Sequence, residues 1–335
     1  MNHLSKAART VRFTQSGGPE VLKIEMLEIP APGPQEVRIQ VKAIGLNRAD
    51  QMYRIGQYME TPVFPSGIGY EAAGIVESVG AEVKDLRVGE VVSVVPAFSL
   101  NQYGTYGELI LVPAYTVRKH PGSLSFEEAA SIWTSFLSMY GLVVEAAKVK
   151  AGQYVVLTAA SSSAGLAAIQ FVNYVGGVSI AITTSGKKRE ALLKAGARHV
   201  IVAGEQDVVA EIGRITTGKG ADVVLDPVAG PLFADLLRAT AERGQVFVYG
   251  ALSQEPALFP SLDVLLKTPT IKGYTAMDVL GNPEVLGAAV DFIYEGIAKG
   301  KLKPVIGKTF PFDQIVEATR FMESNQQVGK VVVTV

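Results

Sequence analysis

The stretch "YVVLTAASSSAGLAAIQFVNYVGG", residues 154–177, decides the fold. A short β-branched run ends at three consecutive serines, and small apolar residues then recur at helical spacing. This order predicts a buried strand, a tight turn and a helix. Similar apolar runs follow about every 23 residues, beginning at Val178, Val200, Val223 and Val246. With helix-like segments between them, these runs predict an α/β fold class with right-handed crossovers and a doubly wound parallel sheet.

The composition excludes several classes of protein. The chain has 335 residues, a formal net charge of -1 and no cysteine, which excludes disulfides, thiolate catalysis and thiolate metal sites. The sequence contains no stripe of lysine and arginine residues of the kind that would indicate nucleic-acid binding. Residues 151–186 carry no charged side chain, but polar and glycine residues interrupt this run, so buried strands around a helix explain it better than a membrane span. The N-terminus lacks the apolar core of a secretory signal, so we expect a cytoplasmic protein.

The two ends of the chain have a different pattern. In "EVRIQVKAIG" (36–45), Val37, Ile39 and Val41 alternate with Arg38, Gln40 and Lys42. Short runs of this kind, separated by Gly and Pro, predict an antiparallel, partly rolled sheet. The same pattern returns in the closing "GKVVVTV". We therefore expect a β-rich domain formed by 1–126 and 271–335, with the α/β domain at 127–270 inserted between them.

The three serines at 161–163 allow three interpretations. One serine could cap the helix, but capping needs only one. A nucleophile elbow requires a later acid and histidine, and the only histidine after Ser163 is His199. The third interpretation is phosphate binding, because a turn that opens a helix presents backbone N–H groups and the positive end of the helix dipole to an anion. The position of the turn, after the first strand of the series, favours the third interpretation.

The end of the second strand indicates which dinucleotide binds. An NAD site has a carboxylate about twenty residues after the turn, to hold the ribose hydroxyls. Here "TTSGKKRE" (183–190) has hydroxyl residues followed by Lys187 and Lys188. Cations suit a 2′-phosphate, so the sequence predicts NADPH over NADH.

Several motifs together resemble the medium-chain dehydrogenase/reductase superfamily, in its zinc-free NADPH:quinone oxidoreductase-like branch. They are "GLNRAD" (45–50), "GYEAAGIVESVG" (69–80), "GTYGELILVP" (104–113), "SFEEAASIWTSFLSMYGL" (125–142) and "TAASSSAGLAAIQ" (158–170). The resemblance implies a Rossmann sheet inserted into a GroES-like domain, and a homodimer. Zinc relatives have a histidine in a G-H-E motif, where this chain has Gly69-Tyr70-Glu71. We therefore expect no metal site.

The resemblance also implies an enzyme that transfers hydride from NADPH to quinones or to the C=C bond of α,β-unsaturated carbonyl compounds. Two alternatives are a non-catalytic NADPH-binding regulatory or structural protein and an alcohol dehydrogenase with an atypical metal site. The implied catalytic residues are Asn47, Asp50 and Tyr58, and the implied substrate residues are Tyr53, Tyr58, Trp133 and Tyr274. The implied cofactor residues are Asn47, Ser138, Ser161, Ser162, Ser163, Ala164, Thr184, Ser185, Lys188, Tyr249, Gly250, Ala251, Ser253 and Lys330.

Structural roles compete with some of these assignments. Asn47 could serve only as a loop cap, because asparagine is common in turns. Asp50 and Arg54 stand four residues apart and could pair with each other on a helix. Trp133 could belong to the core, where large apolar residues usually lie.

Overall fold

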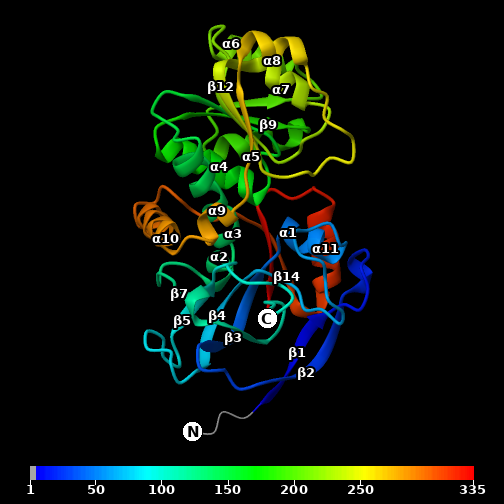
Figure 1. Cartoon of the computed structure of the whole chain (residues 1–335), viewed down its shortest axis with the longest axis vertical. Coiled ribbons are helices and arrows are strands. Elements are labelled where there is room, and N and C mark those ends of the chain that lie inside the picture. The colour runs from blue at the N-terminus through cyan, green and yellow to red at the C-terminus, as the bar shows by residue number, and fades with distance from the viewer. Residues whose placement is uncertain (1–4) are drawn as a thin grey trace. The chain divides into compact units, whose positions relative to one another are not determined.

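A computed structural model describes residues 5–335, and the chain forms two compact units (Figure 1). The β-rich unit combines the chain up to Thr134 with Pro304–Val335, and the α/β unit comprises Ser135–Lys303. The expected boundary at 270 therefore differs from the observed one, since residues 271–303 belong to the α/β unit. Residues 270–273 form a sixth strand, β13 (Thr270–Gly273), which pairs with β12 (Thr240–Val248), and further along the chain the Phe292 ring stacks on Phe171 at 5.8 Å.

The α/β unit contains a parallel sheet of six strands in the order β10-β9-β8-β11-β12-β13. The other strands are β8 (Tyr154–Leu157), β9 (Val178–Thr183), β10 (His199–Val202) and β11 (Ala221–Asp226). The sequence predicted the first five strands and the doubly wound class. The order reverses direction between β8 and β11, and ligands of such sheets bind beyond the carboxyl ends of the strands at this point.

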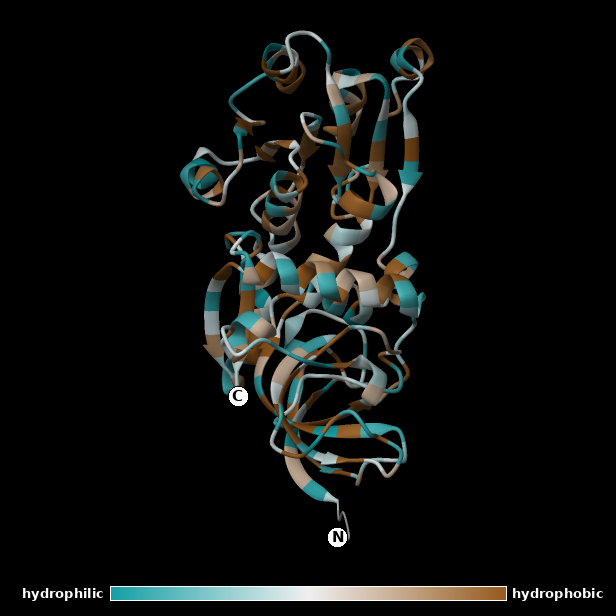
Figure 2. Ribbon diagram, turned by 90° about the vertical axis from the view of Figure 1, so that its left-hand side faces the viewer, coloured by the Kyte–Doolittle hydropathy of each residue, from teal (hydrophilic) through white to brown (hydrophobic). Residues whose placement is uncertain are grey.

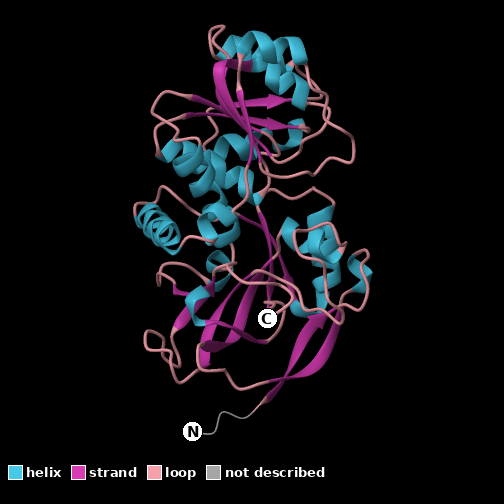
Figure 3. Ribbon diagram, viewed as in Figure 1, coloured by secondary structure: helices cyan, strands magenta, loops and turns pink. Residues whose placement is uncertain are grey.

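Helices flank the strands of this unit (Figure 3). They are α4 (Ser163–Tyr174), α5 (Arg189–Lys194), α6 (Val208–Ile215), α7 (Phe233–Ala239), α8 (Ser261–Lys267), α9 (Met277–Leu280) and α10 (Pro283–Ala298), with short 3-10 η4 (Gly186–Lys188) and π-helical η3 (Tyr140–Ala146). The strand interiors are strongly hydrophobic, whereas the helices carry mixed colouring (Figure 2). This difference fits strands that are covered on both faces. None of the helices described between residues 5 and 335 is long and apolar enough to cross a bilayer.

The β-rich unit has a seven-stranded sheet in the order β14-β15-β3-β4-β5-β7, with β6 also paired to β3, and a separate β1-β2 ribbon. Its strands are β1 (Lys6–Arg12), β2 (Lys23–Ile29), β3 (Glu36–Gly45), β4 (Glu71–Val79), β5 (Val91–Val94), β6 (Leu109–Pro113), β7 (Val117–Lys119), β14 (Ile306–Pro311) and β15 (Lys330–Thr334). Its helices are α1 (Arg48–Arg54), α2 (Phe126–Ala129) and α11 (Ile315–Glu323), with 3-10 turns η1 (Pro19–Val21), η2 (Ala114–Thr116) and η5 (Phe312–Gln314). Helix α3 (Trp133–Met139) contains the boundary between the units.

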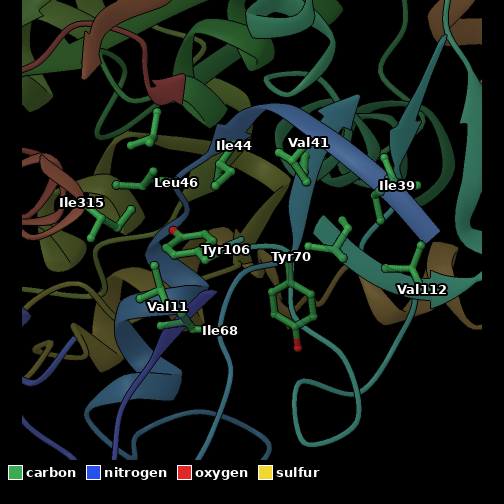
Figure 4. Packing of buried hydrophobic residues seen from close by; sticks show 14 of the residues in the cluster. Val11, Ile39, Val41, Ile44, Leu46, Ile68, Tyr70, Tyr106, Val112 and Ile315 are labelled. Atoms are coloured by element: carbon green, nitrogen blue, oxygen red, sulfur yellow. The ribbon is translucent and has the colours of Figure 1, made fainter. Parts of the chain in front are cut away.

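The apolar face of β3 packs into the main core of this unit (Figure 4). Val37, Ile39 and Val41 are buried there, as the alternation predicts. Arg38, on the opposite face, is also buried, which the alternation does not predict. Its guanidinium donates to Glu77 Oε2 at 2.6 Å and to the Pro30 carbonyl at 3.0 Å. A buried arginine requires such partners, and they come from neighbouring strands and loops.

Candidate functional site

The turn after β8 divides its three serines between different tasks. Ser162 is the N-cap of α4, and its hydroxyl accepts a hydrogen bond from the Gly165 N–H at 3.0 Å. A side chain at Gly165 would place its Cβ 2.6 Å from the backbone of Ala159 and Ala160. Glycine therefore lets the helix start against the strand end. The capping interpretation is correct for Ser162 alone, and it leaves the other two hydroxyls for other partners.

Ser161 is joined to the end of the next strand. The Lys188 ammonium donates to the Ser161 hydroxyl at 3.1 Å, across 27 positions of sequence. Desolvation by burial lowers the pKa of Lys188 from its ordinary value. A half-buried cation beside the N-terminus of a helix can hold an anion. The structure thus brings together Ser161 and Lys188, two residues that the sequence assigned to phosphate binding.

A carboxylate that the sequence analysis missed approaches the same region. Glu205 follows β10, and a Cβ on Gly186 would lie 2.9 Å from its Oε1. Thr184 and Ser185 lie between β9 and η4, at the same edge of the sheet. Residues 184–189, directly after β9, include no acid, but Glu205 reaches the adjoining turn from the segment that follows the neighbouring strand. Only the strand order could reveal this proximity.

Hydrogen bonds connect the segments that follow β11 and β12 at the same edge of the sheet. Asp226, the last residue of β11, accepts from the N–H groups of Val228 and Ala229 at 3.0 Å, and from Thr158 Oγ1. The Ser253 N–H donates to the Val228 carbonyl at 2.9 Å. The predicted cofactor residues Tyr249, Gly250, Ala251 and Ser253 lie in the loop that this hydrogen bond anchors. Cofactor contact by these residues stays a prediction.

Tyr274 and the π-helix η3 form a further close contact within the α/β unit. A Cβ on Gly141 would lie 1.8 Å from the Tyr274 hydroxyl, so only glycine fits there. That hydroxyl is buried and has no hydrogen-bond partner among the described residues. Burial, followed by the charges of Asp278 and Glu145, raises the pKa of Tyr274. Ser138 lies one turn earlier, near the start of this helical segment.

The β-rich unit holds a buried cluster of polar side chains that comes from four segments of the chain. Lys330 Nζ lies 2.7 Å from Glu71 Oε2 and donates to Asn47 Oδ1 at 2.5 Å. Glu71 also accepts from the Trp133 N–H at 2.6 Å. Lys330 was assigned to the cofactor, and here its ammonium is engaged by Glu71 and Asn47. The cluster therefore fixes the position of Asn47.

Asp50 lies beside this cluster, at the start of α1. Its Oδ2 accepts from the Asn47 N–H at 2.8 Å and from the Tyr106 hydroxyl at 2.9 Å. Its Oδ1 is buried without a hydrogen-bond partner among the residues described. Desolvation by burial raises the pKa of Asp50 to about 7, despite these hydrogen bonds and the charge of Lys330. Arg54 does not pair with Asp50, as its spacing had suggested, because it reaches Glu323 at 2.7 Å.

Two predicted substrate residues are buried within the β-rich unit. The Tyr53 hydroxyl donates to Asn101 Oδ1 at 2.9 Å, and the Trp133 indole N–H donates to Ser93 Oγ at 2.8 Å. Both side chains have 0% exposed area, so each has a structural role here. Tyr58 differs, because it is only half-buried. Substrate contact by Tyr53, Tyr58 and Trp133 stays a prediction.

The position of the zinc relatives' histidine is occupied by Tyr70, and the next residue, Glu71, pairs with lysine. Over residues 5–335, no group of three or more His, Cys, Asp or Glu side chains could hold a metal ion.

A doubly wound sheet with a serine-rich turn before α4, together with a β-rich unit formed by both chain ends, is typical of two-domain pyridine-nucleotide oxidoreductases. Residues 33–122 match the alcohol dehydrogenase GroES-like domain, and residues 195–333 match the family described as zinc-binding dehydrogenase.

Comparisons that cover most of this chain specify the branch. The chain is 30% identical to a quinone oxidoreductase of Pseudomonas aeruginosa over 97% of this chain and 99% of that protein. It is also 30% identical to the synaptic vesicle membrane protein VAT-1 homolog of Rattus norvegicus, over 96% of this chain and 83% of that protein. The crystal structure of Escherichia coli quinone oxidoreductase complexed with NADPH is similar, with a TM-score of 0.88, 28% identity and coverage of 98% and 100%. The chain belongs to the medium-chain dehydrogenase/reductase superfamily, in its quinone oxidoreductase and VAT-1 branch.

Proposed function

We propose that this oxidoreductase transfers hydride from NADPH to quinones, or to the C=C bond of α,β-unsaturated carbonyl compounds, without zinc. The observation that carries the proposal is the contact between Lys188 and Ser161 at the phosphate-binding edge of the sheet. A lysine at this place suits the 2′-phosphate that distinguishes NADPH from NADH. The Escherichia coli relative, whose structure contains NADPH, supports the same assignment.

The residues at the strand ends fit a dinucleotide. The N-terminus of α4 offers backbone N–H groups to a diphosphate, and Gly165 permits the close approach of helix and strand. Lys188 and Ser161 supply a cation and a hydroxyl for a further phosphate. Bound NADPH would supply the hydride, while the chain holds the cofactor and the acceptor in register.

The β-rich unit supplies the residues for the acceptor. Burial raises the pKa of the Tyr58 phenol, so Tyr58 stays protonated at neutral pH and acts as a hydrogen-bond donor toward a carbonyl oxygen. An electron-poor π system suits this arrangement, because it spreads the charge of the incoming hydride before a proton arrives from solvent. The products are a hydroquinone or a saturated carbonyl compound.

The test is NADPH oxidation with a panel of naphthoquinone, phenanthrenequinone, an alkenal and an alkenone. We expect turnover with at least one acceptor, and weaker turnover with NADH. Tight NADPH binding without turnover of any acceptor would favour the non-catalytic alternative. Metal analysis of the purified protein tests the alcohol dehydrogenase alternative, since turnover that depends on bound zinc would contradict the proposal.

We also propose that the protein is a homodimer formed through β13. This strand is exposed along its length and ends the described sheet order. Large apolar side chains are exposed in the preceding segment, namely Leu258, Phe259, Leu262, Leu265 and Leu266. An open strand edge beside an apolar patch suits pairing with a second copy about a two-fold axis. Light scattering should show a dimer that Leu265→Glu weakens, and a monomeric wild-type protein would contradict this proposal.

A further inference from the structure

The loop formed by residues 57–65 exposes large apolar side chains next to Tyr58. The side chains of Met59, Val63 and Phe64 are 62%, 67% and 43% exposed. Single exposed apolar residues are common on protein surfaces. Three within six positions follow the proposed hydrogen-bond donor in the sequence, so this loop offers exposed apolar area to a ligand that binds at Tyr58.

Asn101, which follows β5 in the sequence, holds this loop by its backbone. Its Oδ1 accepts from the Val63 N–H at 2.9 Å, and its Nδ2 donates to the Thr61 carbonyl at 3.1 Å. The same Oδ1 accepts from the buried Tyr53 hydroxyl at 2.9 Å. One amide thus connects two points of the loop to α1. We call these three hydrogen bonds the Asn101 clamp.

The residues just before Asn101 hold the other side of the loop. The Ser99 hydroxyl donates to Glu60 Oε2 at 2.9 Å. The Phe98 ring lies 5.6 Å from the Tyr70 ring, and the Tyr70 ring lies 6.0 Å edge-on from the Tyr58 ring. Segment 98–101 therefore supports the loop backbone directly and the ring of Tyr58 through the ring of Tyr70.

We propose that Asn101 is a positioning residue that sets the acceptor specificity: its clamp presents Met59, Val63 and Phe64 as a fixed apolar platform beside Tyr58. The inference rests on the proposed function and deepens it. The favoured acceptors carry an extended apolar body, such as fused aromatic rings, next to the carbonyl group.

The physical reason is preorganisation. A loop that is already ordered loses little conformational entropy when a ligand covers it, so more of the contact free energy appears as affinity. Each methylene-sized apolar group that the platform buries should then improve binding about fourfold. A loose loop would lose most of this gain for large acceptors and little for small ones.

The experiment compares Asn101→Ala with Gln35→Ala in kinetics with benzoquinone, naphthoquinone and phenanthrenequinone. Gln35 is an exposed amide of the same unit that bonds Glu82 at 2.8 Å, so it is a matched control. We expect Asn101→Ala to raise the KM for phenanthrenequinone about tenfold and the KM for benzoquinone less than twofold. The KM for NADPH should stay close to the wild-type value, and the melting temperature should fall only modestly, because the Tyr53 hydroxyl keeps its hydrogen bond with Ser66. Val63→Ser should also raise the KM for phenanthrenequinone more than the KM for benzoquinone.

Calorimetric binding of phenanthrenequinone to the full chain without cofactor separates the two proposals. If the wild-type protein binds it, Asn101→Ala weakens this binding, and no acceptor turns over, the platform stands and the proposed function fails. If turnover occurs but Asn101→Ala changes all three KM values equally, or no more than Gln35→Ala does, the platform is wrong. An absence of both binding and turnover contradicts both proposals.

Discussion

The polar residues of the two units differ in burial. In the β-rich unit, Lys330, Glu71 and Asp50 have at most 2% exposed area, although each can carry a charge. In the α/β unit, Lys188 is half-buried and Glu205 is exposed at the strand ends. The first set has protein partners for most of its polar atoms, whereas the second set lies where a ligand can reach it.

This difference shows that residues such as Lys330 and Lys188, which the family resemblance assigns to the same cofactor, can have different physical roles. Buried charges must be paired, so their main effect is on stability and on the placement of neighbours such as Asn47. Charges near the surface act on whatever binds beside them, and solvent weakens their effect. Substitutions in the β-rich cluster should therefore change the free energy of unfolding. Substitutions at the proposed phosphate site, formed by Ser161 and Lys188 at the sheet edge (the phosphate edge), should change nucleotide affinity.

The largest expected effect follows from breaking the buried ion pair. Lys330→Met leaves the Glu71 carboxylate buried without its cation, and removing one partner of such a pair typically costs about 3–5 kcal/mol. Guanidinium denaturation should show this loss in the free energy of unfolding. The control is Lys299→Met, which breaks an exposed pair with Glu295 and should cause no measurable change. Comparable stabilities of the two variants would contradict the structural role of the cluster.

A pH dependence of stability should follow from Asp50. Its pKa is about 7 when folded, against an ordinary value of 3.8, so between these values the folded protein binds a proton that the unfolded chain lacks. Stability should therefore fall as pH rises through this window, with a slope approaching about 1.4 kcal/mol per pH unit. Asp50→Asn should remove this part of the slope. Denaturation from about pH 5 to pH 8 measures it, and equal slopes would show that Asp50 titrates normally.

At the phosphate edge, Lys188→Gln should weaken NADPH binding about 10- to 100-fold, as expected for a lost charge-assisted hydrogen bond. NADH has no 2′-phosphate, so its dissociation constant should change little. Titration of both nucleotides measures the difference. The control is Lys187→Gln at the neighbouring exposed position. An equal loss for the two nucleotides would mean that Lys188 does not select the phosphate.

The smallest expected effect is at Glu205. Its carboxylate approaches the turn at Gly186, next to Lys188, and an exposed negative charge there should repel a 2′-phosphate modestly. Glu205→Gln should tighten NADPH binding several-fold at low ionic strength and less at high salt. NADH affinity should stay constant. Weaker NADPH binding in this variant would instead indicate that Glu205 accepts a hydrogen bond from the cofactor.

Much of the fold could be predicted because its signals are local. The spacing of the apolar runs identified β8 to β12 and the helices between them, since both faces of a parallel strand are buried. The sequence analysis did not identify β13, because "TIKG" is short, exposed and partly polar. Only its pairing with β12 in the folded chain makes it a strand. The α/β unit therefore extends to Lys303, beyond the boundary expected at residue 270.

The candidate site could be predicted in part. Ser161 and Lys188 were assigned from motif position, and the fold brings them within hydrogen-bond distance. Glu205 and Asn101 were not found, because nothing in "AGEQD" or "SLNQY" marks a residue that acts on a distant turn or loop. Their partners are separated from them in sequence, and no spacing rule connects them.

The amino-acid order alone therefore defines the α/β class, the β-rich ends, the strand-to-helix turn at Ser161 and the family, because periodicity, turn residues and motifs act over short stretches of chain. Which charges are buried, and which polar groups meet, depends on the folded chain. Lys330 meets Glu71 across 259 positions and Asn101 meets Val63 across 38. Desolvation and charge act through space, so the raised pKa of Asp50 and the ordered loop at 57–65 follow only from the packing that surrounds them.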